Sequence, residues 1–496
     1  MARPNILFIL TDQQRYDTIS ALGNEHIHTP NFDRLVRKGV SFTNAYSTCP
    51  VCMPARYTIR TGCEPPRTRI FSNNMSLSDQ ESHSLTTRCG PYLAETMKGR
   101  GYRTFGIGKF HSRPWDEDLG YETHLHSEEM YSTPEQRKRD AYAQWIAQEH
   151  PEYDFVEMLM GERSEMYYMP QMSPLPADLG VESWATDRAI EQISAQDSRP
   201  FFGVVSYIGP HPPLAPPLPY NRMYDPDSMP PPSVGTQESD HLDEYIPYVN
   251  YRVFAEDIGS THAKILKSRY YGEISYIDHC LGRLLDSLEA NEQTANTLIC
   301  FTSDHGDQMG DHNAWQKESF FDASCKIPFI VSQPGTLPEN TRNEQLVCLT
   351  DLFGLATTAS GEPEVRDGIN ILNALHDKEQ QRSYLIGYHG TPGSNDFKAM
   401  VRKDEWKYIF MANGGLEQLF NLKLDPNETD NLCASHASTC EQLKTILTSH
   451  LQKNGPAEAI DNGKLLAQKH TKKSLSRAYQ FDRSRVGEPY SHSSKK

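Results

Sequence analysis

The chain of 496 residues carries 65 acidic and 49 basic side chains, a net charge of −16, and 37% of its residues are hydrophobic. Its length predicts one large domain and a smaller one. The acidic balance argues against a nucleic-acid partner, because general phosphate binding requires a basic face. No apolar run approaches the ~20 residues that span a bilayer, so we expect no membrane partner. Ten cysteines without regular spacing are expected to be mostly reduced thiols.

The first apolar run, NILFIL at 5–10, continues directly into Thr11 and Asp12. A signal peptide requires a longer apolar run and a small-residue cleavage site. We therefore interpret this run as a buried first strand. The expected location is the cytoplasm, or the periplasm if a leader has been removed.

Apolar strands alternate with polar helices along most of the chain, which is typical of α/β proteins. Strands are predicted at 5–10, 102–108, 201–209, 297–307 and 326–334, and helices at 29–39, 92–101, 182–195 and 271–291. Ligands of open parallel sheets bind beyond the carboxyl ends of the strands. Polar side chains at these ends predict one shared site, made of Asp12, Lys109, His111, His211, Asp304 and His305.

The texture of the sequence changes after about Leu375. Short apolar runs separated by Gly and Asp-Pro turns, followed by a helix near 438–453, predict a smaller α+β domain over 376–460. The tail at 461–496 is basic, and we interpret it as a solvated or wrapping segment. Two long segments, 116–180 and the Pro-rich 209–235, are as consistent with surface decoration as with substrate recognition.

The stretch CPVCMPARYTIRTG, from Cys49 to Gly62, contains two cysteines three positions apart. A structural zinc site would need a second C-x-x-C or a His pair at matching spacing, and the sequence has neither. In Cys52-Met53-Pro54-Ala55-Arg56, with Thr61-Gly62 downstream, the arrangement resembles the sulfatase signature C-x-P-x-R…T-G. We interpret Cys49 as a small buried residue outside this signature, in preference to a resolving thiol.

Other segments extend the resemblance to the sulfatase family in chain order, over roughly residues 3–432. RPNILFILTDQQR is similar to the first strand and metal loop, GIGKFH to the Gly-Lys-x-His strand end, and GPHPPLAP to the His-Pro loop. FTSDHGDQMGDHNAWQKESFFDASCKIPFIV is similar to the second metal motif, and LFNLKLDPNETDNL to a C-terminal element.

The resemblance implies a formylglycine-dependent type I sulfatase of the alkaline-phosphatase-like superfamily, of the bacterial carbohydrate sulfatase kind. The implied fold is a large mixed, mostly parallel sheet sandwiched by helices, with a smaller C-terminal α+β domain carrying an antiparallel sheet. It also implies one divalent metal, with Ca²⁺ as our first expectation and Mn²⁺ or Mg²⁺ left open by a nitrogen ligand. The implied metal ligands are Asp12, Gln13, Cys52, Asp304 and His305.

The same resemblance implies the catalytic residues. Cys52 would be oxidised to formylglycine, and a hydroxyl of its hydrate would attack sulfur with Asp304 as base. Arg56 and Lys109 would neutralise charge, and His111 would take a proton when sulfate is expelled. His211 and Lys317 would bind sulfate and protonate the leaving alcohol, and we favour His211 as the acid because an unperturbed lysine is a weak donor.

Several alternatives stay open. Many sulfatases have two consecutive aspartates in the first metal loop, whereas Gln13 follows Asp12 here, as in choline sulfatases and phosphonate monoester hydrolases. A phosphonate or phosphate diester is therefore the second candidate substrate. A non-catalytic binding protein with an unmodified Cys52 is the third hypothesis. Expected partners are a small-molecule or oligosaccharide sulfate ester, a formylglycine-generating enzyme and a second copy of the chain; Arg15 and His389 are further candidate substrate contacts.

Overall fold

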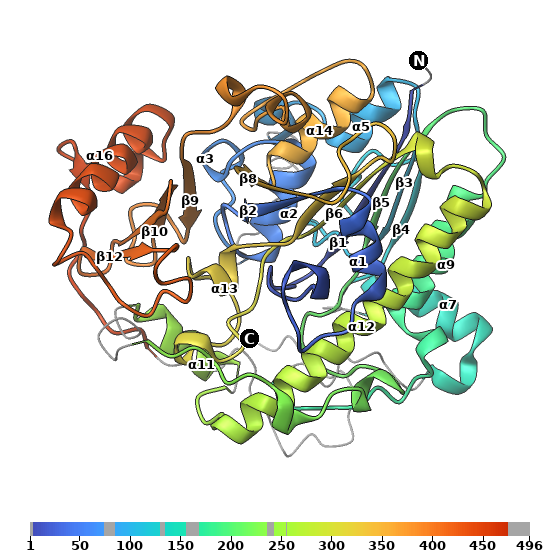
Figure 1. Cartoon of the computed structure of the whole chain (residues 1–496), viewed down its shortest axis with the longest axis horizontal. Coiled ribbons are helices and arrows are strands. Elements are labelled where there is room, and N and C mark those ends of the chain that lie inside the picture. The colour runs from blue at the N-terminus through green and yellow to red at the C-terminus, as the bar shows by residue number, and fades with distance from the viewer. Residues whose placement is uncertain are drawn as a thin grey trace.

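A sheet of eight strands forms the centre of the protein, in the order β4-β3-β5-β1-β6-β7-β2-β8 (Figure 1). We describe it from a computed structural model, which covers residues 3–73, 85–128, 134–154, 168–235, 243–253 and 255–474. Only β7 runs antiparallel to its neighbours, so the expected mixed, mostly parallel sheet is confirmed. The strands are β1 (Asn5–Thr11), β2 (Val40–Tyr46), β3 (Arg103–Gly108), β4 (Thr123–His126), β5 (Phe201–Ser206), β6 (Thr297–Ser303), β7 (Phe329–Ser332) and β8 (Thr341–Cys348).

Successive side chains of β1 enter two different hydrophobic clusters, because side chains of a strand alternate between faces. Leu7 and Ile9 belong to one cluster, and Ile6 and Phe8 belong to the other. Each cluster is closed by helices, so β1 is apolar from Ile6 to Leu10, as expected of a strand covered on both faces. One face is covered by α1 (Pro30–Arg37), α9 (Val181–Ile193) and α12 (Ser260–Ala290), the other by α2 (Cys52–Thr61), α5 (Leu93–Gly99) and α14 (Asp351–Ala359).

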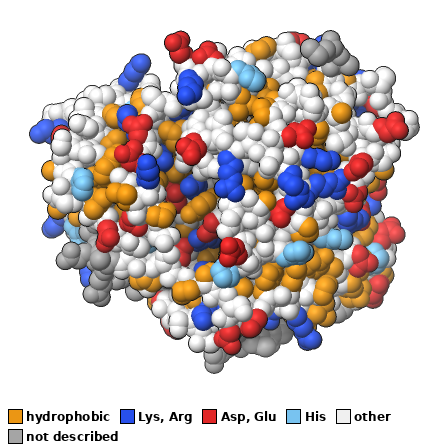
Figure 2. Space-filling model, viewed as in Figure 1, with side chains coloured by type: hydrophobic (Ala, Val, Ile, Leu, Met, Phe, Trp, Pro, Cys, Tyr) orange, Lys and Arg blue, Asp and Glu red, His pale blue; other side chains and the backbone are white. Residues whose placement is uncertain are grey.

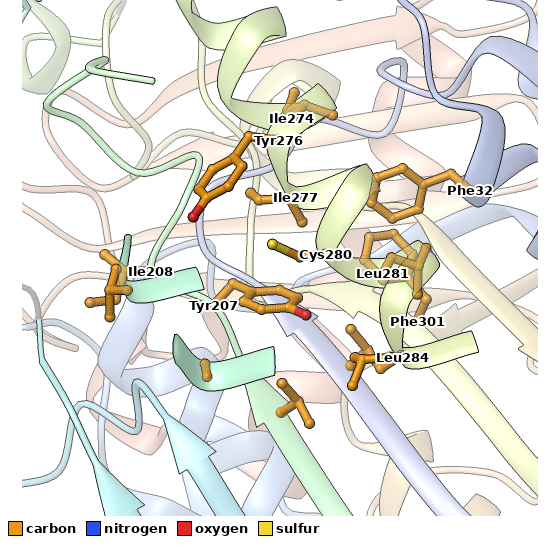
Figure 3. Close-up of a cluster of buried hydrophobic side chains, with 14 of the residues drawn as sticks. Phe32, Tyr207, Ile208, Ile274, Tyr276, Ile277, Cys280, Leu281, Leu284 and Phe301 are labelled. Atoms are coloured by element: carbon orange, nitrogen blue, oxygen red, sulfur yellow. The ribbon is translucent and has the colours of Figure 1, made fainter. Parts of the chain in front are cut away.

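The helix α12 contributes more residues to the first cluster than α1 or α9 does (Figure 3). Ile277, Leu281 and Leu284 recur at helical spacing and are fully buried, with Phe32 of α1 and Phe301 of β6 in the same cluster. This packing anchors β6 beside β1, and the two strands pair in parallel along their whole length.

Some elements differ from the sequence prediction. α12 begins at Ser260, eleven positions before the predicted start at 271, because its first turns are polar and lack a continuous apolar stripe. The strands β2 and β8 and the helices α2 and α14 were not predicted. β2 carries the polar residues Thr43 and Asn44 in its middle, which hide its strand pattern.

A second sheet of four antiparallel strands, in the order β12-β11-β10-β9, lies beside the first (orange to red at the left of Figure 1). One face packs against α16 (Ala437–Asn454), and the other packs against Tyr46, Phe320 and Phe321 of the main body. This confirms the expected C-terminal antiparallel sheet, while the boundary at 375/376 and the limits 460/461 stay predictions. The strands are β9 (Leu385–His389), β10 (Lys398–Lys403), β11 (Trp406–Met411) and β12 (Leu416–Asn421).

Buried charges join the two sheets. The Lys407 side chain on β11 is fully buried; its Nζ lies 2.7 Å from Glu428 Oε1 and also pairs with Asp322. The same amino group donates to the Phe320 carbonyl at 2.8 Å. Buried ions are tolerated only when their partners are complete, so this cluster fixes how the small sheet sits against the segment that follows Lys317.

Acidic and basic side chains are scattered over the face shown in Figure 2 rather than separated by sign. Within the described part of the chain, every helix is too short or too polar to cross a bilayer. The remaining short helices are α3 (Pro65–Thr68), α6 (Pro134–Arg137), α7 (Ala141–Glu149), α11 (Tyr245–Arg252), α13 (Asp322–Cys325) and α15 (Ile371–Ala374). The segments 116–180 and 461–496 lie partly outside the described residues.

Candidate active site

Cys52 is the first residue of α2, and its side chain is fully buried. All ten residues of this helix are buried, and Gly62 ends it in a left-handed conformation (φ 66°) that favours glycine. Cys49 lies in the preceding loop, where its thiol approaches the Phe71 carbonyl at 3.6 Å. The two cysteines therefore face different surroundings, and Cys49 is a buried small residue, as predicted.

Three side chains that can ligate a metal surround the Cys52 thiol. Asp12 follows β1, and Asp304 and His305 follow the neighbouring β6, so strand pairing brings them together at one sheet edge. Ligand atoms of these three residues and Cys52 all lie within 4.8 Å of one another. The Cys52 sulfur is 3.7 Å from Asp12 Oδ1 and 3.2 Å from His305 Nε2.

The His305 ring is oriented for ligation. Its Nδ1 lies 2.9 Å from the Gly306 carbonyl, an acceptor, which favours a proton on Nδ1. Nε2 then directs its lone pair at the group formed by Asp12 and Cys52. A backbone carbonyl behind the non-ligating nitrogen is the usual support of a metal-bound histidine. Two carboxylates and this imidazole therefore fit a divalent cation.

Gln13, the fifth predicted ligand, has a backbone φ of 70°. Its Oε1 accepts a hydrogen bond of 2.7 Å from Lys317 Nζ, and the same amino group donates to the Cys52 sulfur at 2.9 Å. Gln13 is thus linked to Cys52 through the Lys317 amino group.

Cationic side chains balance these acids from within the protein. Arg56 Nη2 lies 2.9 Å from Asp12 Oδ2, and its Nε lies 2.9 Å from Asp304 Oδ2, so one guanidinium bridges the two carboxylates. Lys109, directly after β3, lies 2.7 Å from the same Asp12 oxygen. All are nearly or fully buried, and Arg56 sits one helical turn after Cys52 on α2.

Electrostatics set the protonation of this group. Burial by itself would raise the pKa of Asp12, but Lys109, His211, Lys317 and Arg56 hold it well below its usual range. Burial and Asp12 would raise the pKa of the Cys52 thiol, but the charges of Lys317 and Lys109 hold it well below its usual value. Burial and the Asp12 charge raise the pKa of Asp304.

The two remaining histidines flank the same group. His211 is 4% exposed; its Nδ1 lies 2.8 Å from the Pro212 carbonyl and its Nε2 4.0 Å from Asp12 Oδ1. His111 has a φ of 50° and lies beside Cys52, and burial lowers its pKa. The structure therefore brings together every residue that the sequence assigned to the site.

The two weaker candidates lie elsewhere. Arg15 donates to the Asp307 and Gln308 carbonyls at 3.0 and 3.1 Å and pairs with Asp311 at 2.8 Å, so it ties down the loop after His305. His389 is buried on β9, with Nε2 3.7 Å from Glu318 Oε1. The contacts given for Arg15 and His389 are thus with other groups of the protein.

Three contributors were missed by the sequence reasoning. Asp307 and Tyr168 contact Gln13, and Glu128 accepts hydrogen bonds from the backbone N–H groups of Phe110 and His111. Asp307 had a signal, because it lies two positions after a predicted ligand. Tyr168 and Glu128 belong to the segment 116–180, whose pattern carries no motif.

Comparison with known proteins identifies the family of the chain. The sulfatase family model matches residues 4–360, and the model described as N-sulphoglucosamine sulphohydrolase, C-terminal, matches residues 310–455. An arylsulfatase of Clostridium perfringens is 28% identical over 94% of this chain and 97% of its own length. A choline-sulfatase of Rhizobium meliloti is 27% identical over 89% and 84%.

Among solved structures, the phosphonate monoester hydrolase of Agrobacterium radiobacter superposes with a TM-score of 0.74 at 24% identity, covering 91% of this chain and 96% of that one. This likeness shows a shared fold. Since the first family model spans most of the chain, we conclude that the protein belongs to the sulfatase family, with the alkaline-phosphatase-like fold, and is a sulfuric ester hydrolase.

Proposed function

We propose that the protein is a metal-dependent sulfatase that acts on the sulfate ester of a sugar or oligosaccharide through a formylglycine made from Cys52. One observation carries the proposal: the Cys52 sulfur contacts both the candidate metal ligands and a cationic side chain. His305 Nε2 and Asp12 Oδ1 lie on one side, and Lys317 donates to it at 2.9 Å. A nucleophile between a cation site and the positive charge of Lys317 suits attack on an anionic ester.

The donor set supports a divalent cation held by Asp12, Gln13, Asp304, His305 and position 52. When bound, the cation would supply positive charge to sulfate oxygens and make the nucleophilic hydroxyl more acidic. Carboxylate and amide oxygens favour Ca²⁺, and the imidazole nitrogen makes Mn²⁺ and Mg²⁺ the alternatives to test. Formylglycine would supply the hydroxyl oxygen that attacks sulfur.

The protein's own residues then have separable tasks. Asp304, whose pKa is raised, is suited to accept the proton of the attacking hydroxyl. His111, which lies beside position 52, would accept a proton when sulfate departs. Arg56 and Lys109 hold the carboxylates in place by balancing their charge. Lys317 would pair with a sulfate oxygen.

His211 is the proposed general acid for the leaving alcohol. Its Nδ1 faces a carbonyl and its Nε2 faces a carboxylate, and both partners favour a doubly protonated ring that can release the Nε2 proton. Lys317 is engaged by Gln13 and Cys52 and would retain its charge during turnover.

A sugar substrate is supported by the match of residues 310–455 to a family model named after an N-sulphoglucosamine sulphohydrolase. The test is sulfate release from a panel of sulfated monosaccharides, sulfated oligosaccharides, choline sulfate and aryl sulfates, using protein coproduced with a formylglycine-generating enzyme. Hydrolysis of a sulfated sugar in preference to the other sulfate esters supports the proposal.

The second candidate is a phosphonate monoester or phosphate diester hydrolase using the same nucleophile. The Asp12-Gln13 pair favours it, because the chain resembles choline sulfatases and phosphonate monoester hydrolases at these positions. Turnover of these esters without sulfate release from any panel member would establish this reading instead. Mass spectrometry of the tryptic peptide 39–56, which contains Cys52, separates both enzymes from a binding protein that keeps the thiol.

A further inference from the structure

The side-chain amide of Gln13 lies between the carboxylate of Asp307 and the ammonium group of Lys317. Its Nε2 donates to Asp307 Oδ2 at 2.5 Å, and its Oε1 accepts from Lys317 Nζ at 2.7 Å. An ionised carboxylate only accepts hydrogen bonds, and an ammonium only donates them. These two neighbours therefore permit a single orientation of the amide, with the nitrogen toward Asp307 and the oxygen toward Lys317.

Asp307 is itself fixed by two further donors. The Tyr168 hydroxyl donates to Asp307 Oδ2 at 2.6 Å, and the Met309 backbone N–H donates to Asp307 Oδ1 at 2.8 Å. The carboxylate is fully buried. On the other side, the Gln13 backbone N–H donates to Asp304 Oδ1 at 3.1 Å, so the backbone and the side chain of Gln13 are both anchored.

We propose that Asp307 is a positioning residue: it orients the Gln13 amide so that its oxygen, and not its nitrogen, faces the metal. The inference rests on the proposed metal site. It explains how a neutral residue serves where a carboxylate, whose two oxygens are equivalent, would need no orientation. Because outer groups that orient ligands typically alter metal affinity by about 10- to 100-fold, the effect is measurable in binding alone.

The variant Asp307→Asn exchanges donor and acceptor in the hydrogen bond between position 307 and the Gln13 amide. The Met309 N–H requires an acceptor, so the Asn oxygen would turn toward Met309 and its NH₂ toward Gln13. Gln13 would then rotate, placing its own NH₂ toward Lys317 and the metal. Combining this change with Gln13→Glu restores an oxygen on both sides, because the Glu carboxylate can accept from the Asn NH₂ and still face the cation.

The experiment measures binding of Ca²⁺, Mn²⁺ and Mg²⁺ by calorimetry to metal-free full-length protein. We expect Asp307→Asn to weaken binding about 10- to 100-fold and the double variant Gln13→Glu/Asp307→Asn to recover most of that loss. Asp278→Asn, the same change at a buried carboxylate of α12 that accepts hydrogen bonds from Asn31 and Phe32, is the matched control and should bind within a few-fold of the unmodified sequence.

Three results would overturn the inference. Equal affinity of Asp307→Asn and the unmodified sequence would show that Gln13 needs no orienting partner. Equal loss in the single and double variants would mean that Asp307 acts only through stability, which thermal unfolding of each variant monitors. Binding of none of the three cations by the unmodified sequence would refute the proposed metal site, and the inference with it.

An independent observation concerns two thiols far along the chain. The Sγ atoms of Cys433 and Cys440 are 2.8 Å apart, inside ordinary sulfur contact. Cys433 is half-buried and precedes α16, whereas Cys440 lies in the first turns of that helix. The two cysteines are seven positions apart in the sequence, so the short segment between them keeps the two thiols close.

We infer that Cys433 and Cys440 form a reversible oxidation site in the folded protein. A disulfide oxidant such as oxidised glutathione would accept two electrons; the two thiols would lose two protons and form one S–S bond, and the oxidant would leave as two thiols. The bond would fasten the start of α16 to the segment after β12.

Both thiols lie in one tryptic peptide, residues 424–444, so oxidation is read directly. After treatment of native protein with oxidised glutathione and alkylation in denaturant, we expect this peptide two hydrogens lighter and unalkylated, while the buried Cys49 is fully alkylated. Cys433→Ser should abolish the lighter form. Alkylation of both thiols, or a glutathione adduct on Cys433 without ring closure, would overturn the inference.

Discussion

Replacing His211 with Asn should lower turnover by an amount that depends on the leaving group. His211 is 4% exposed, and its Nε2 lies 4.0 Å from Asp12 Oδ1. Asn keeps a polar group there but cannot deliver a proton. A sugar alkoxide needs that proton to leave, whereas a nitrophenolate leaves as a stable anion. The loss should therefore be large for a sugar sulfate and small for nitrophenyl sulfate.

The size of the effect follows from two contributions. Loss of general acid catalysis costs about 10²- to 10⁴-fold, or roughly 3–5 kcal/mol of transition-state stabilisation. Loss of one positive charge beside Asp12 affects both substrates equally, and we assign it about tenfold, or ~1.4 kcal/mol. We thus expect kcat/KM to fall about 10³- to 10⁵-fold for the sugar sulfate and about tenfold for the nitrophenyl ester.

The assay is kcat/KM for both esters, with Lys317→Ala as the comparison. Lys317 binds charge rather than donating a proton in our proposal, so its removal should slow both substrates by the same factor, about 10²- to 10³-fold. An equal loss for both esters in His211→Asn, or a leaving-group dependence in Lys317→Ala, would refute the assignment of the acid to His211.

Three further changes test other parts of the protein. Cys52→Ser, in protein from cells that modify cysteine only, should abolish sulfate release while leaving the thermal midpoint within a few degrees. Lys407→Met should cost about 3–5 kcal/mol of unfolding free energy by denaturant titration, because Asp322 and Glu428 stay buried without their cation; a cost below about 1 kcal/mol would contradict this. Burial raises the pKa of Glu64 to about 8, so the stabilising contribution of this side chain is present at low pH and is lost as pH rises toward 8. The free energy of unfolding of Glu64→Gln should therefore rise by about 1 kcal/mol per pH unit relative to that of the unmodified sequence between pH 5 and 8. Parallel curves of unfolding free energy against pH for the two proteins would contradict this.

The site was predictable where the chemistry sits next to a regular element. Asp12 and Asp304 each follow an apolar strand, and the pairing of β1 with β6 brings them together. Lys109 follows β3 in the same way. Such residues combine a local signal, a polar side chain at the end of an apolar run, with a general rule about strand ends.

The parts that were not predicted depend on contacts between distant segments. β2 and β8 pair with each other and carry polar residues, so their strand character arises from partners and not from pattern. Tyr168 reaches Asp307 across 139 positions of the chain. Periodicity cannot reveal such a contact, because neither residue belongs to a repeating apolar face.

The difference between local pattern and distant contact also applies to Gln13, which stands where many sulfatases have a second aspartate. From the sequence, Gln13 removes a negative charge from the metal loop. In the structure a carboxylate is still close by, because Asp307 Oδ2 lies 2.5 Å from Gln13 Nε2. The charge therefore stands one hydrogen bond behind the amide instead of in it. Since Coulomb energy falls with distance, a cation would feel Asp307 less than a directly bound aspartate, and Lys317 can approach the amide oxygen at 2.7 Å while it also donates to Cys52.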